Sequence, residues 1–121
     1  MIRIRSSSDA YRFVSTFGLQ EEKRNRLIVV YMSADGEVLD WNEREQDAAL
    51  IKLKDVYAAV NAVIVTNHPN GNSLPDKYDI QETMIMRELL EAKGIGLVDQ
   101  LIVGYREFYS YADERITIIN K

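Results

Sequence analysis

Apolar runs separated by polar turn segments divide the sequence into a regular series of predicted elements. The unbroken apolar run Leu27–Met32 is rich in β-forming residues, which predicts a central strand buried on both faces. The dipeptide Asp35-Gly36 predicts a tight hairpin turn, with the returning strand over residues 37–41. Residues 62–65 predict a second short buried strand that leads directly into a polar loop.

Three further segments have apolar residues at helical spacing. The first is capped by Ser8 and Asp9 and stops at Gly18. The second covers residues 47–61, where apolar positions three or four residues apart predict one face of a helix. That predicted face consists of Leu50, Leu53, Tyr57 and Val60. The third helix begins near Asp76 and ends at Lys93-Gly94, and its predicted apolar stripe consists of Ile85, Leu89 and Ala92.

The C-terminal third of the chain has the pattern of strands. Residues 97–103 and 107–111 predict two strands joined through Gly104, and residues 115–119 predict a last edge strand. Alternating strands and helices favour an α/β or α+β sandwich, with a mixed sheet flanked by helices. With no internal repeat and no linker, we expect one domain over residues 1–121.

Composition narrows the function classes. The chain has 121 residues, 46% of them apolar and 28% charged, and it contains no cysteine, which excludes disulfides and thiolate metal sites. No apolar run reaches the roughly 20 residues that span a bilayer, so we expect a cytoplasmic protein with no membrane contact. The net charge of −4 gives nucleic-acid binding little support. The basic clusters at residues 23–26 and 52–54 are interpreted as solvated faces.

The candidate chemistry lies just after the second buried strand. His68 is the only histidine, and it stands where a rigid strand passes into a loop. Asp79 follows in the first turn of the predicted third helix, so an imidazole and a carboxylate can converge as two ligands of a zinc ion. A second interpretation is purely structural. His68 is then a turn residue, and Asp76 and Asp79 satisfy free N–H groups at the helix start.

Several ordered motifs resemble one known family. Residues 66–71 read TNHPNG and residues 75–79 read PDKYD, which resembles the His-x-His-Pro-Ser-Gly … Pro-Ser-x-x-Asp signature of the RadC family. Residues 94–104 (GIGLVDQLIVG) and 108–114 (FYSYADE) are similar to later segments of that family. RadC proteins belong to the JAB/MPN (JAMM) zinc metallohydrolase superfamily. The resemblance therefore implies a JAB/MPN-like, cytidine-deaminase-like fold.

The resemblance also implies roles for individual residues. His68 matches the second zinc histidine of the family and Asp79 matches the zinc aspartate. Thr66 stands at the first histidine position, where a neutral hydroxyl is a much poorer zinc ligand than imidazole. Asp76 stands at the position of the serine that helps to stabilise the tetrahedral intermediate, so an anion replaces a hydroxyl donor.

The position of the family's glutamate base is also altered. A gapless comparison puts Asn42 at this position, so Glu43 or Glu45 would have to act as the base. Asn70 replaces the loop serine, and Gln100 replaces the histidine that follows the aspartate in the next motif. Together these departures weigh against ordinary zinc hydrolysis.

The predicted function is therefore a RadC-like domain with an incomplete zinc site, acting as a non-catalytic binding or regulatory module, that is, a pseudoenzyme. The alternative is an active metal-dependent hydrolase of the peptidase or isopeptidase type with a rearranged set of ligands. His68, Asp76 and Asp79 would suit Mn²⁺, Fe²⁺ or Mg²⁺ better than tightly bound zinc. The family carries a DNA-repair label. An unknown protein partner, contacted through the tyrosines or Trp41, and a monomer or a dimer paired through the C-terminal strand are further expectations.

Overall fold

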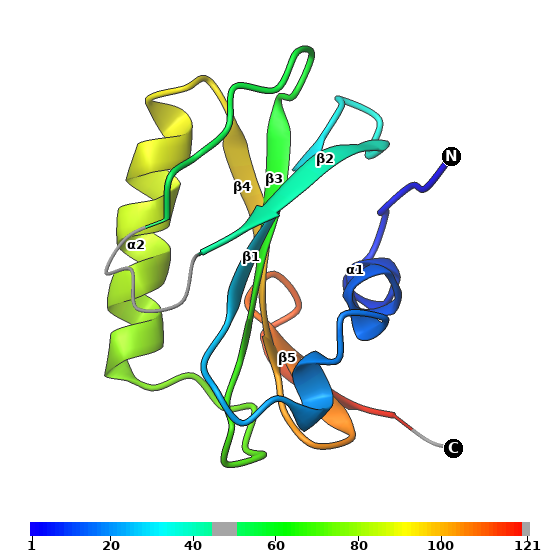
Figure 1. The fold of residues 1–121 in the computed structure, drawn as a ribbon, viewed down its shortest axis with the longest axis vertical. Coiled ribbons are helices and arrows are strands. Elements are labelled where there is room, and N and C mark those ends of the chain that lie inside the picture. Colours follow the sequence, from blue (N-terminus) through cyan, green and yellow to red (C-terminus); the bar gives the residue numbers. More distant parts are fainter. Residues whose placement is uncertain (45–50, 120–121) are drawn as a thin grey trace.

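A mixed six-stranded sheet with one α-helix on each face forms the framework of the protein (Figure 1). The computed structural model describes residues 1–44 and 51–119. The strand order is β2-β1-β3-β4-β5-β6, and β3 and β4 are the parallel pair. The strands are β1 (Leu27–Met32), β2 (Val38–Glu43), β3 (Asn61–Asn67), β4 (Gly96–Val103), β5 (Glu107–Ser110) and β6 (Arg115–Ile118). The helices are α1 (Ser7–Ser15), the short 3-10 helix η1 (Leu19–Glu21) and α2 (Lys77–Glu91).

The central strands β1 and β3 separate two apolar cores. Because successive side chains of a strand point to opposite faces, β1 contributes to both cores, and all six of its residues are buried. Ile28, Val30 and Met32 pack toward α1, whereas Leu27, Val29 and Tyr31 pack toward α2. The α1 face and the α2 face of the sheet are thus distinct environments.

The predicted hairpin between the first two strands is confirmed. Gly36 has a φ of 87°, and a Cβ at this position would lie 2.5 Å from the carbonyl oxygen of Ile4. The turn therefore needs glycine both for its backbone conformation and for the close passage of the N-terminal segment. The returning strand is longer than the predicted residues 37–41 and extends to Glu43.

Both α-helices begin with a side-chain cap, and that of α2 is a capping box. The cap of α1 is Ser6 rather than Ser8: the Asp9 N–H donates to Ser6 Oγ, and the Asp9 carboxylate accepts from the N–H of Arg5. In α2 the predicted cap at Asp76 is confirmed. None of the described helices has the length and apolarity needed to cross a membrane.

The predicted helix over residues 47–61 is wrong for the part that the structure describes. Residues 51–60 contain no helix, and residues 45–50 lie outside the described chain. The segment is instead held by side chains, because Tyr31 Oη accepts from the Lys54 N–H and Asn42 Nδ2 donates to the Lys52 carbonyl. The predicted helix face is not a buried face, since Tyr57 is 96% exposed.

The apolar stripe predicted for α2 is also wrong. Ile85 and Leu89 are exposed, and the buried residues of the helix are Asp79, Thr83, Met86 and Leu90. Thr83 Oγ1 donates to the carbonyl oxygen of Asp79, which satisfies one polar group inside this stripe. The helix is thus rotated so that Asp79 faces the sheet. The three C-terminal strands agree with the prediction, and β6 is the edge strand.

Candidate metal centre

The end of β3 places His68 beside the start of α2. The backbone N–H of His68 donates to the Val103 carbonyl, which continues the pairing with β4 by one residue. The preceding residue, Asn67, is fully buried. Its side chain accepts from the Arg26 N–H at 2.6 Å and donates to the Arg24 carbonyl at 2.9 Å. The position of His68 is therefore fixed by a sheet register on one side and a buried amide on the other.

Both ring nitrogens of His68 have partners. Nδ1 lies 2.7 Å from the carbonyl oxygen of Asn72, and Nε2 lies 2.8 Å from Asp79 Oδ2. A carbonyl oxygen can only accept, so Nδ1 carries the proton and donates it. Histidines that bind metals are commonly oriented in this way, with the second nitrogen donating to a backbone carbonyl. Nε2 is the nitrogen that this arrangement aims at Asp79.

The two acidic residues form the capping box of α2. The Asp79 N–H donates to Asp76 Oδ1 at 2.9 Å, and the Asp76 N–H donates to Asp79 Oδ2 at 2.8 Å. Burial raises the pKa of the Asp79 carboxyl, while the backbone N–H of Asp79 lowers the pKa of the exposed Asp76 carboxyl. His68, Asp76 and Asp79 each offer one ligand atom, and these atoms lie within 4.8 Å of one another. The structure thus brings together three of the residues singled out in the sequence.

Thr66 is buried and engaged elsewhere. It is 1% exposed, and its hydroxyl oxygen accepts from Gln100 Nε2 at 3.3 Å. Thr66 therefore faces Gln100, which replaces a family histidine, and the hydrogen bond joins two of the departures identified in the sequence. A neutral hydroxyl that takes part in such a hydrogen bond would be a poor metal ligand.

Glu43 lies on the other face of the sheet. It pairs with Ile28 across the β1–β2 ladder, so its side chain projects toward α1. Arg26 donates to its two carboxylate oxygens from Nε at 2.6 Å and from Nη2 at 2.8 Å. The structure does not bring Glu43 together with His68. Glu45 lies outside the described residues.

At this end of β2, the side chains that face α2 are an amide and a guanidinium. Asn42 pairs with Val29, and its amide oxygen accepts from Tyr31 Oη at 2.7 Å. Arg44 follows the strand and donates its N–H to the Leu27 carbonyl, in register with Thr66 on the next strand. The Arg44 guanidinium lies 2.8 Å from Glu82 Oε2, one turn beyond Asp79 on α2.

Arg44 is a functional candidate that the sequence analysis missed. Its side chain also donates to Asn25 Oδ1 at 2.8 Å, and Asn25 Nδ2 donates to the Asn67 carbonyl. Two contacts therefore connect the guanidinium to the neighbourhood of His68. Alternate residues of a strand point to the same face, so extending β2 by one residue puts Arg44 on the same face as Asn42. This could be read from the sequence only if the strand register were known.

The donor set fits a divalent cation with a preference for oxygen ligands. One imidazole and two carboxylates supply nitrogen and oxygen atoms suited to Mn²⁺, Fe²⁺ or Mg²⁺. Zinc sites of the catalytic type use three protein ligands with strong nitrogen, sulfur or carboxylate donors, and Thr66 does not add to such a set. The group could hold a metal ion, and zinc is the metal typical of the JAB family.

A strand-end histidine facing a helix-start aspartate, in a mixed sheet with helices on both faces, defines a domain of the JAB type. The sequence matches the family described as "RadC-like JAB domain" over residues 4–116, and the chain belongs to this family. It is similar to a UPF0758 protein of Aquifex aeolicus (strain VF5), with 27% identity over 95% of this chain and 53% of the relative. A UPF0758 protein of Protochlamydia amoebophila (strain UWE25) is 28% identical over 95% of this chain and 53% of the relative. The chain thus spans about half the length of these curated relatives.

Proposed function

We propose that this protein is a non-catalytic RadC-like domain, which binds a divalent cation through His68, Asp76 and Asp79 and acts as a binding or regulatory module. The observation that best supports this proposal is the type of side chain at the end of β2. There, on the α2 face of the sheet and in register with Thr66, no carboxylate is present among the described residues. The α2-facing positions nearest this residue are Asn42 and Arg44, and Glu43 projects to the other face. A cation held at His68 would have no carboxylate of this strand beside it.

Water activation at a metal needs a proton acceptor close to the bound water. The Asn42 amide has no basic group, and a guanidinium stays protonated throughout the physiological range. Arg44 also neutralises Glu82, the acidic residue one turn along α2 from Asp79. The next α2-facing carboxylate of β2 is Asp40, and it is paired with Lys54 at 2.9 Å. The charges around the site favour holding a cation over activating its water.

A bound divalent cation would supply a fixed positive charge and Lewis acidity between β3 and α2. The residues of the chain would do the rest: Asn72 would hold the imidazole in one tautomer, and the Asp76–Asp79 capping box would fix both carboxylates. Binding would then join the end of β3 to the start of α2. Such a site suits a module that presents a stable surface to a partner, and the net charge of −4 favours a protein over a nucleic acid.

The test combines metal titration with a turnover assay on protein made without a histidine tag. Calorimetric titration with Mn²⁺ should give stoichiometric binding by the wild-type protein and none by His68→Ala. Thr66→Val is the matched control, since it removes a hydroxyl outside the proposed ligand set and should leave the affinity unchanged. The metal-loaded protein should not hydrolyse fluorogenic peptide or isopeptide substrates.

Two outcomes would contradict the proposal. If wild type and His68→Ala bind equal, substoichiometric amounts of metal, the proposed cation site does not exist. Metal-dependent turnover that His68→Ala abolishes would instead establish the active hydrolase with rearranged ligands.

A further inference from the structure

The two edges of the sheet differ in how they are protected against pairing with a further strand. β2 is one edge and β6 is the other. The Arg44 N–H donates to the Leu27 carbonyl, so every second residue of β2 bonds to β1, and the main chain of Trp41 points outward. The outward N–H of Trp41 donates to Asp40 Oδ1 at 2.7 Å, and the pairing with β1 is irregular beyond Tyr31. A charged side chain and an irregular register thus protect the β2 edge.

The outer main-chain groups of β6 lack this protection. The Ile119 N–H donates to the Arg106 carbonyl, and the register of β5 and β6 continues from this pair without a shift. Every second residue of β6 therefore bonds to β5, and the residues between them are Ile116 and Ile118. The N–H and C=O groups of these two isoleucines point away from the sheet. In residues 1–44 and 51–119, no strand lies beyond β6 to pair with them.

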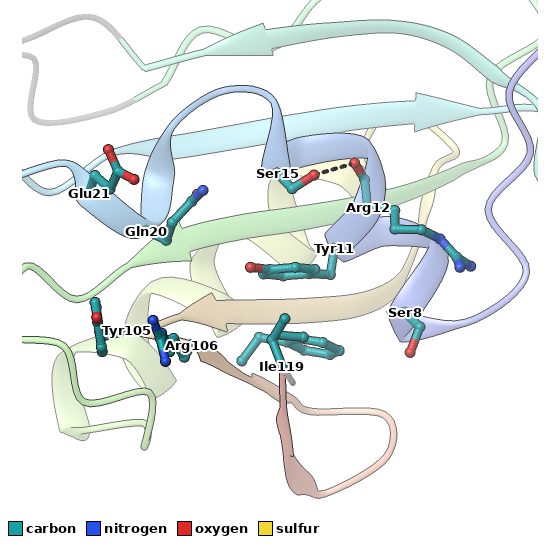
Figure 2. Close-up of a pocket in the computed structure, with 10 residues that line it drawn as sticks. Ser8, Tyr11, Arg12, Ser15, Gln20, Glu21, Tyr105, Arg106 and Ile119 are labelled. Atoms are coloured by element: carbon teal, nitrogen blue, oxygen red, sulfur yellow. Dashed lines mark hydrogen bonds between the residues drawn. The ribbon is translucent and has the colours of Figure 1, made fainter. Parts of the chain in front are cut away.

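The β6 edge is also apolar and open. On the α1 face, a cavity of about 630 Å³ lies between α1 and Ile119, so the helix does not close over the end of this strand (Figure 2). Phe108 belongs to the core on the α1 face and pairs with Thr117, so Ile116 and Ile118 project to the α2 face. There Ile116 is 36% exposed and Ile118 is 69% exposed. An uncovered edge with apolar side chains is a surface suited to strand pairing.

We propose that β6 is a homodimer interface, in which the β6 strands of two copies pair antiparallel about a two-fold axis at Thr117. In this register Ile116 of each copy lies opposite Ile118 of the other, so all the outward N–H and C=O groups of these residues form hydrogen bonds. The isoleucines pair with one another on the α2 face, and the two Thr117 side chains meet on the α1 face. Arg115 lies opposite the uncharged Ile119. The two sheets become one continuous sheet.

The sequence of β6 is complementary to itself in this register. An axis at Ile116 would put Ile118 opposite Glu114, a carboxylate opposite an apolar side chain. The Glu114 N–H already donates to the Ser110 carbonyl, and its φ of 55° is not that of a strand. An axis at Ile118 would put Ile116 opposite a position beyond the end of β6. The axis at Thr117 pairs apolar residues with each other and sets no like charges opposite one another, so a second copy of the chain is the partner that fits this edge.

The first test is sedimentation velocity in EDTA, so that the result does not depend on any metal. Because each copy contributes one short strand, the dimer should be weak, and the mass should rise from monomer to dimer as the protein concentration increases. Ile118→Lys should weaken the association by at least about tenfold, since a charge replaces an isoleucine in both Ile116–Ile118 pairs. The matched control Ile85→Lys changes an exposed isoleucine of α2 and should leave the association unchanged.

Single cysteines test the register, since the chain has no cysteine of its own. Directly opposite residues in a non-hydrogen-bonded pair have Cα atoms about 4.5 Å apart, within the range of about 4.4–6.8 Å that a disulfide spans. Thr117→Cys should therefore form a disulfide-linked dimer under mild oxidation. Arg115→Cys is the control and should not, because the cysteines of the two copies would be separated by about 13 Å along the strands.

The proposal is overturned if the wild-type protein stays monomeric at every concentration, if Ile118→Lys associates as wild type does, or if Thr117→Cys forms the linked dimer no faster than Arg115→Cys. His68→Ala should dimerise as wild type does, and Ile118→Lys should still bind Mn²⁺ normally. A failure of the dimer is therefore distinguishable from a failure of the cation site.

Discussion

The imidazole of His68 and the carboxylate of Asp79 meet at 2.8 Å, while the other ring nitrogen of His68 donates to the Asn72 carbonyl. With Nδ1 committed to a carbonyl, the contact between Nε2 and Asp79 Oδ2 needs a proton or a cation between the two atoms. This single relationship makes the end of β3 a candidate cation site.

Cation binding should therefore release a proton. A metal at Nε2 displaces the proton shared with Asp79, so Mn²⁺ binding should release about one proton and the affinity should increase as the pH rises. Calorimetric titration in two buffers of different ionisation enthalpy measures this number directly. Identical heats in the two buffers would show that the metal does not replace that proton.

Asp76 has two separable roles. Asp76→Ala should lower the free energy of unfolding by about 1 kcal/mol, because it removes the side-chain acceptor at the start of α2. Asp76→Ser keeps an oxygen that can cap the helix, so it should lower the free energy of unfolding by only about a few tenths of a kcal/mol. Both variants should weaken Mn²⁺ binding. Urea denaturation together with calorimetry distinguishes the roles, and full Mn²⁺ affinity in Asp76→Ser would exclude Asp76 as a ligand.

Glu43 should matter for stability and not for chemistry. Its two hydrogen bonds with Arg26 are partly buried, so Glu43→Gln should lower the free energy of unfolding by about 1–3 kcal/mol. Asp40→Asn is the control, since the Asp40–Lys54 pair is more exposed and should contribute less than about 1 kcal/mol. Denaturant titration of the three proteins measures both effects. An unchanged stability of Glu43→Gln would contradict the assignment.

Asp35 should give the fold an acid-dependent contribution. The Ser33 hydroxyl, and after it Arg3, lower the pKa of Asp35 from 3.8 to about 2. A carboxyl whose pKa is lower in the folded state stabilises that state above its unfolded pKa, and this stability is lost as the pH falls through about 2. NMR titration should find this midpoint. In Asp35→Asn the stability difference from wild type should disappear in the same pH range, and a midpoint near 3.8 would contradict the prediction.

The features that could be predicted from the sequence are those with a local cause. The hairpin at Gly36 and the cap at Asp76 depend on residues within a few positions, and both are confirmed. The buried run that precedes His68 identified β3 and the strand-end position of the histidine. The family motif added the expectation that Asp79 would face this histidine, and the two side chains do meet.

The features that could not be predicted depend on contacts between distant segments. Residues 51–60 have helical spacing, but Tyr31 and Asn42 bind the backbone of Lys54 and Lys52, and the segment contains a turn and no helix. The apolar pattern of α2 favoured Ile85, whereas the helix turns Asp79 and Thr83 inward because those polar groups are satisfied there. The face of Glu43 followed only from its pairing with Ile28, since a shift of one residue moves a side chain to the opposite face of a sheet.

The central proposal is that His68, Asp76 and Asp79 hold a cation, and that no carboxylate of the described strand β2 stands beside it to accept a proton from bound water. The most direct measurement is an anomalous-scattering map of crystals grown with Mn²⁺. The account predicts one peak coordinated by His68 Nε2 and carboxylate oxygens of Asp76 and Asp79, with Arg44 still paired to Glu82. A peak elsewhere, or a metal-bound water hydrogen-bonded to a glutamate that follows or belongs to β2, would contradict it.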